Sequence, residues 1–144
     1  MEVNDQFMNL KFDEIKKYGL HDTEIDNVEI NDGTLIVDFS SGVFYLDSFG
    51  KELAKSKNCK IIFEIGGLNK QNVYEHLEIF KKRKNTVKEL KFDNFKKMLN
   101  DNIFSIDGNY YSDFNNSILL KGFLKKFQLE ITIFDIDKIS INFD

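Results

Sequence analysis

The chain has 144 residues, enough for one domain with a sizeable hydrophobic core. Hydrophobic residues make up 42% of it and charged residues 31%, a balance typical of a folded globular protein rather than a disordered one. A net charge of −4 excludes a strongly basic nucleic-acid-binding protein by composition. Because the N-terminus is acidic and the apolar runs are short, we expect no signal peptide, no membrane span and a cytoplasmic location.

Charge is unevenly distributed along the sequence. Residues 18–50 contain seven acids and no Lys or Arg, whereas residues 81–97 contain eight basic residues and two acids. The basic run could contact nucleic-acid phosphates. We favour a solvated strand edge whose lysines discourage aggregation, because the whole chain is acidic and lacks a clear aromatic stacking platform.

The first predicted elements are a helix and a β-hairpin. Residues 4–18 carry an apolar helical stripe and end before Gly19, which predicts a short amphipathic helix. Residues 28–30 and 34–39 alternate apolar and polar side chains on either side of an Asn-Asp-Gly turn, the pattern of a hairpin. Residues 42–46 are a candidate third strand.

The middle of the chain is predicted to mix strands and helices. Residues 59–65 are predicted to form a buried strand. Cys59, the one cysteine of the chain, is predicted to be a reduced, buried thiol within it. An apolar stripe over 69–84, with basic residues in its last turn, predicts a second helix. A short strand over 86–92 and a short helix from Asp93 to Asn102 follow.

The last third is predicted to be rich in β-structure. A polar, aromatic loop over 107–117 precedes strands at 118–124 and 127–133, joined by a Lys-Lys turn, and a final strand at 138–143. Strict period-two alternation indicates antiparallel strands with one face in the core. The sequence therefore predicts a single α+β domain over residues 1–144, a curved antiparallel sheet covered by two or three helices.

The doublet His21-Asp22 is the first candidate for chemistry. Metal-dependent phosphohydrolases with such a doublet need further ligands, but the only other histidine, His76, lies on a predicted helix and no second Cys supports a zinc site. Glycine-rich phosphate loops, calcium loops and Gly-x-Ser-x-Gly motifs are also missing. We therefore predict no catalytic residue, metal or cofactor. Asp22 is expected to accept backbone N–H bonds at the entrance to the hairpin, with the imidazole against the sheet edge.

Acidic residues of the predicted hairpin share one face. The apolar side chains of both strands point to the core, which leaves Glu29 and Asp38 on the exposed side, with Asp26 and Asp32 near its ends. A clustered negative surface attracts a cationic partner and speeds association. Ordinary charge for solubility is the alternative.

The loop over 107–117 is a second candidate contact surface. Tyr110, Tyr111 and Phe114 lie there among Gly, Ser and Asn, a mixture that resembles recognition surfaces. The interpretation that we favour is a hairpin loop whose aromatic side chains fold back onto the core.

Residues 20–39 resemble a group of small bacterial proteins that open with Leu-His-Asp-x-x-Ile, followed by a strand, an Asn/Asp-Gly turn and a second alternating strand. The matching residues are Leu20, His21, Asp22, Ile25, Ile30, Gly33, Leu35 and Phe39. Several members of this group are similar to immunity proteins of polymorphic toxin systems, and the alternating C-terminal strands fit the resemblance loosely. Residues 66–102 have no counterpart in it.

The resemblance implies a non-enzymatic cytoplasmic protein that neutralises a cognate toxin by covering it. A nuclease toxin would suit an acidic surface, because its active site is basic. The predicted partner-binding residues are Asp26, Glu29, Asp32, Asp38, Tyr110 and Tyr111. A small-ligand-binding protein or hydrolase using His21 and Asp22, and a regulatory interaction module, are the alternatives. Nucleic-acid and membrane partners are not expected.

Overall fold

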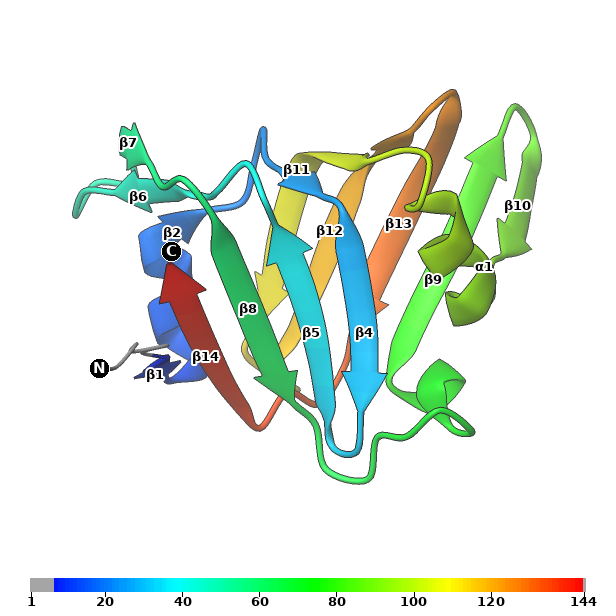
Figure 1. Ribbon diagram of the computed structural model, residues 1–144, viewed down its shortest axis with the longest axis horizontal. Coiled ribbons are helices and arrows are strands. Elements are labelled where there is room, and N and C mark those ends of the chain that lie inside the picture. Colours follow the sequence, from blue (N-terminus) through cyan, green and yellow to red (C-terminus); the bar gives the residue numbers. More distant parts are fainter. Residues whose placement is uncertain (1–6, 144) are drawn as a thin grey trace.

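Two antiparallel β-sheets pack face to face in the computed structural model, which describes residues 7–143 (Figure 1). The first sheet has the spatial order β1 (Met8–Leu10), β14 (Lys138–Phe143), β8 (Cys59–Glu64), β5 (Thr34–Phe39) and β4 (Asn27–Asn31). The second has the order β10 (Thr86–Glu89), β9 (Leu77–Arg83), β13 (Phe127–Ile133), β12 (Ser117–Leu124), β11 (Phe104–Ser112) and β3 (Glu24–Ile25). A small third sheet comprises β2 (Tyr18–Gly19), β6 (Phe44–Leu46) and β7 (Glu52–Lys55).

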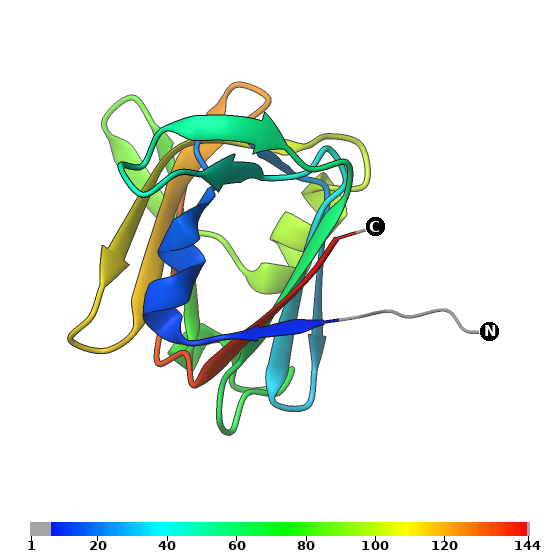
Figure 2. The same ribbon diagram turned by 90° about the vertical axis from the view of Figure 1, so that its left-hand side faces the viewer.

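Helical segments lie at the open sides of this sandwich. The 3-10 helix η1 (Phe12–Lys17) covers the side near β14, as Figure 2 shows. The α-helix α1 (Phe92–Met98) lies at the other side, next to β4 and β9 (Figure 1). A short 3-10 helix, η2 (Val73–Glu75), precedes β9. The two sheets thus cover each other, and the helices fill the gaps at their edges.

The core lies between the two sheets and follows the period-two pattern of their strands. On β5, Leu35, Val37 and Phe39 are buried while the residues between them are not. On β13, Leu129, Ile131 and Ile133 alternate in the same way. Each sheet therefore presents one apolar face, and burying the two faces against each other removes both from water.

The predicted α+β class is wrong. The chain is mainly β, and α1 is the one α-helix in residues 7–143. The largest error concerns 69–84, where the structure has only η2 and then β9, whose backbone pairs with β13. Leu77 and Ile79 are buried and alternate with partly exposed Glu78 and Phe80, so the apolar residues of this segment also fit the period-two pattern of a strand. A second sheet, rather than helices, covers the first.

Three other elements differ from their predictions. Residues 8–17 form β1 and η1 instead of one helix, while 4–6 of the predicted helix lie outside the described residues. The third-strand candidate, β6, pairs with β2 and β7 in the small sheet and not with β5. β11 extends through Ser112, so the predicted loop shrinks to 113–116.

The other predicted strands and the short helix after residue 92 are confirmed. The structure contains the hairpin β4–β5 and the buried strand β8, and α1 buries Phe95 and abuts Leu99. Strand β10 lies within the predicted range 86–92. The C-terminal strands β12, β13 and β14 also occur where they are expected, with Lys125-Lys126 as the turn between the first two.

Candidate protein-binding site

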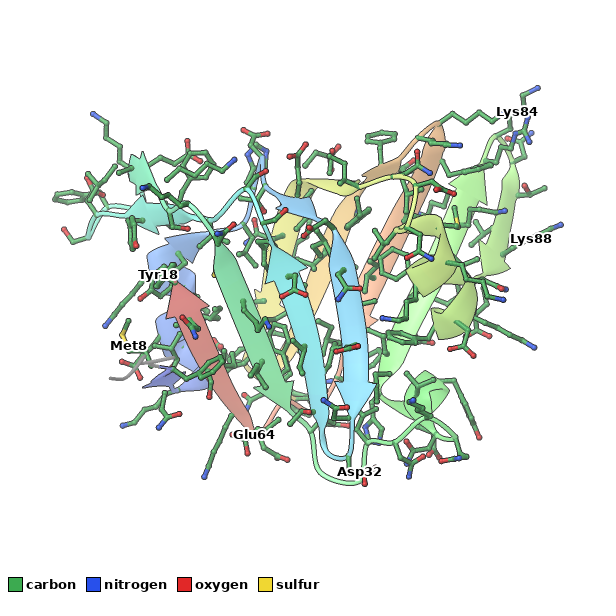
Figure 3. All side chains as sticks on the ribbon, viewed as in Figure 1. Met8, Tyr18, Asp32, Glu64, Lys84 and Lys88 are labelled. Carbon is green, nitrogen blue, oxygen red and sulfur yellow. The ribbon has the colours of Figure 1, made fainter. Side chains whose placement is uncertain are left out.

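The β4–β5 hairpin presents its polar residues on the outer face of the first sheet. Val28 and Ile30 are buried in the core, and Glu29 between them is exposed. Asp38 lies opposite Asn27 in the register, and therefore on the same outer face as Glu29. Asp32 is exposed at the hairpin turn, where Figure 3 labels it.

The four acids of this region differ in their surroundings. The Asp38 carboxylate accepts a hydrogen bond from Asn27 Nδ2 at 3.1 Å and lies 3.8 Å from Lys60 Nζ. Asp26 Oδ1 accepts a hydrogen bond from the backbone N–H of Ser40 at 3.2 Å. Within residues 7–143, no hydrogen bond or ion pair involves the carboxylates of Glu29 or Asp32. Glu29 and Asp32 are therefore the acids available to a partner, while Asp26 and Asp38 also support the hairpin.

A groove of about 660 Å³ adjoins the outer edge of β4. Residues 29–31 line one side of it, and the opposite side mixes apolar and aromatic residues with polar and charged ones, Lys70, Gln71, Glu89, Lys91, Asp93 and Lys96. The apolar and aromatic residues of that side come from η2, the start of β9, the connection between β10 and α1, and the start of α1: Val73, Tyr74, Leu77, Leu90 and Phe92. Glu29 thus belongs to both the acidic outer face and the groove, which makes the two features one continuous surface.

Lys96 ties α1 to the edge of β4. Its Nζ donates a hydrogen bond to the backbone carbonyl of Val28 at 2.6 Å and a longer one to Asn27 Oδ1 at 3.4 Å. This contact shows that the Val28 carbonyl points away from β5 and towards the groove. A charged donor on a strand edge makes a stronger hydrogen bond than a neutral one, so Lys96 covers this end of the edge.

The two predicted tyrosines lie on the second sheet, away from the acids. Tyr110 points outward from β11, is 54% exposed and has Lys121 Nζ 5.5 Å from its ring centre. Tyr111 points the other way, accepts a hydrogen bond from Asn109 Nδ2 at 3.0 Å and packs edge-on against Phe12. Burial raises the pKa of Tyr111. The structure therefore does not bring Tyr110 and Tyr111 together with the acids.

His21 and Asp22 form an exposed turn beside β11. Asp22 has a φ of 64°, its backbone N–H donates to the carbonyl of Ile106 at 2.8 Å, and its carboxylate lies 3.0 Å from His21 Nδ1. Its backbone rather than its side chain thus forms the contact with the sheet. The adjoining hollow contains Tyr18 and Tyr111 but not His76. Within residues 7–143, no group of three or more His, Cys, Asp or Glu side chains could hold a metal ion.

Cys59 is buried at the start of β8. Burial, helped by the nearby negative charge of Asp38, raises the pKa of its thiol to about 12. The thiolate is the reactive form, so the raised pKa and the burial both disfavour reaction of this thiol. The burial agrees with the buried thiol predicted from the sequence.

The first five basic residues of the run, from Lys81 to Lys88, lie on the β9–β10 hairpin, whereas Lys91, Lys96 and Lys97 lie at the start of α1 or in it. Lys81 and Lys88 face each other across the two strands, Lys82 pairs with Glu130, and Lys84 forms the turn (Figure 3). β10 is the outermost strand of the second sheet, and all four of its residues are exposed. Lysines on such a strand oppose pairing with another sheet, which agrees with the interpretation that we favoured from the sequence.

Comparison of the chain with protein-family models, curated proteins and solved structures finds no match. Among the described residues, no helix is both long and apolar enough to cross a membrane.

The sequence interpretation does not predict the far side of the groove, because it places residues 69–84 in a helix. In that interpretation, Val73 and Leu77 belong to a stripe facing the core of the sheet. The alternation of Leu77 and Ile79 with Glu78 and Phe80 is the signal that could have indicated β9, and with it an open side between β4 and β9.

Proposed function

We propose that the chain is a non-enzymatic binding protein that neutralises a protein toxin by direct contact through the β4–β5 side of the molecule. The observation that carries this proposal is the continuous surface formed by unpaired Glu29 and Asp32 and the groove beside β4. The resemblance of residues 20–39 to immunity proteins supports the same function.

The surface combines the two properties that a stable protein complex needs. Exposed acids steer a basic partner and increase the rate of association. The groove offers apolar and aromatic side chains, including Tyr74 with 66% of its surface exposed, and buried aromatic contacts dominate binding energy. A nuclease toxin, with a basic active site, is the class of partner that this combination suits best.

The experiment tests whether the gene next to that of this chain encodes a toxin domain, and whether that domain binds the chain. The double variant E29K/D32K should fold, because both side chains are exposed and have no ion-pair partner in residues 7–143. We expect it to associate with the toxin domain roughly tenfold more slowly at low salt, with a weaker dependence on ionic strength. Stopped-flow fluorescence measures the rate.

A matched control reverses two exposed acids elsewhere, Glu52 on β7 and Asp107 on β11. E52K/D107K changes the net charge by the same amount, so it separates a local effect from a global one. If both variants slow association equally, the acidic face is not the docking surface. If the toxin domain does not bind the wild-type protein, and the protein does not protect cells that express that domain, the proposed function is wrong.

A further inference from the structure

We propose that the edge of β4 at Ile30 binds an extended peptide segment as an added strand, with an apolar residue opposite Ile30 and a basic residue opposite Glu29. This inference rests on the proposed function and names how the partner is held. Its basis is the direction of the backbone groups of β4, the groove beside them and the charge of Glu29.

The register of the hairpin determines which backbone groups face the groove. In an antiparallel pair, every second residue bonds to its neighbour strand and the others point their N–H and C=O away. A two-residue turn places the Asn31–Thr34 pair among the bonded ones, so Glu29 also bonds to β5 while Val28 and Ile30 point outward. The hydrogen bond from Lys96 to the Val28 carbonyl agrees with this assignment.

The N–H and C=O of Ile30 are therefore open to a ligand. Apart from sheet ladders, no hydrogen bond within residues 7–143 involves either group. Lys96 occupies the carbonyl of Val28, so the open part of the edge is centred on Ile30, where the groove lies. One residue of an added antiparallel strand can donate to and accept from Ile30 at the same time.

β4 differs from the other outer strands of the two main sheets. β1 and β3 have three and two residues, and β10 has four and carries Lys88. β4 has five residues and no lysine of its own. Proteins keep edge strands from pairing with other chains by making those strands short or charged. In the half of β4 beside the groove, Glu29 is the one feature of this kind.

The side chains around Ile30 define the segment that fits. A residue opposite Ile30 directs its side chain inward, towards the apolar wall of Val73, Leu77 and Phe92, and must be apolar. The residue after it lies opposite Glu29 on the outer face, where Lys or Arg forms a favourable cross-strand pair. A second copy of the chain fits poorly, since pairing through both Val28 and Ile30 would set two Glu29 side chains opposite each other.

Nuclear magnetic resonance titration of the full chain with an acetylated, amidated peptide, Ser-Thr-Leu-Lys-Ser, tests the inference without any toxin. At millimolar peptide we expect shifts of the Ile30 amide and slower hydrogen exchange at that amide. Two matched peptides isolate the contacts. Replacing Lys by Glu should weaken binding about two- to fivefold. N-methylation of the Leu, which removes the donor to the Ile30 carbonyl, should weaken it about two- to tenfold.

Substitutions in the protein give the second control. Tyr74→Ala, at the exposed wall of the groove, should weaken peptide binding, whereas Tyr110→Ala, on the other sheet, should not. The inference is overturned if the Ile30 amide is unaffected, if the N-methylated peptide binds equally well, or if Ile30 is protected by a concentration-dependent dimer instead. Because no toxin is present, these outcomes are independent of the charge-reversal experiment that tests the proposed function.

Discussion

Phe95→Ala should strongly destabilise the protein, because Phe95 anchors α1 in the open side of the sandwich. The side chain is 1% exposed and packs edge-on against Phe104, with ring centres 6.1 Å apart and an interplanar angle of 82°. The same helix supplies Phe92 and Lys96 to the groove. Loss of this anchor therefore tests both the fold and the wall of the candidate site.

The expected cost follows from the burial of the ring. Replacing a fully buried Phe by Ala reduces the free energy of unfolding by about 3–5 kcal/mol, including the cavity that is left. For a chain of this length, each kcal/mol lowers the melting temperature by about 2–4 °C, so the midpoint should fall by roughly 10 °C. Urea denaturation followed by far-ultraviolet circular dichroism measures the free energy directly.

Phe114→Ala is the matched control, since Phe114 lies in the loop between β11 and β12 and is 99% exposed. It should change the free energy of unfolding by no more than about 0.5 kcal/mol. A cost below about 1 kcal/mol for Phe95→Ala, or equal costs for the two variants, would refute the placement of α1 against Phe104.

Two further substitutions test the environments of single side chains. Tyr111→Phe removes the hydrogen bond from Asn109 and should cost about 0.5–1.5 kcal/mol in urea denaturation, while Tyr110→Phe should be neutral; the reverse order would contradict the orientation of β11. Cys59 keeps its proton up to a pKa of about 12 when folded but loses it near 8.5 when unfolded. The wild type therefore loses free energy of unfolding as pH rises between these values, whereas Cys59→Ala has no thiol to ionise. Between pH 8 and pH 10, the free energy of unfolding should fall less for Cys59→Ala than for the wild type.

The alternation of apolar and polar residues along the chain is enough to predict the β4–β5 hairpin, which carries Glu29 and Asp38 on its outer face. Apolar residues at every second position and an Asp-Gly turn specify β4, β5 and the outward direction of Glu29 without reference to the rest of the chain. What surrounds those acids depends on contacts distant in the sequence. Lys60 comes from β8 and Lys96 from α1, and no local pattern indicates that they lie beside Asp38 and Val28.

The predicted class failed mainly at one ambiguous segment. The spacing of Val73, Leu77 and Phe80 fits a helical stripe, but hydrogen bonds to β13 make 77–83 a strand. Once that segment is a strand, the second sheet has six strands and covers the apolar face of the first sheet. No helix is then needed to cover that face. The groove beside β4 exists only in this arrangement, so it could not be predicted from the sequence.

The docking surface itself is tested most directly by amide hydrogen exchange of the protein with and without the toxin domain. We expect slower exchange in residues 27–34, including Ile30, and in η2 and the start of α1, with β7 and β11 unchanged. Protection confined to β6–β7 or to β9–β10, with residues 27–34 unaffected, would contradict the account.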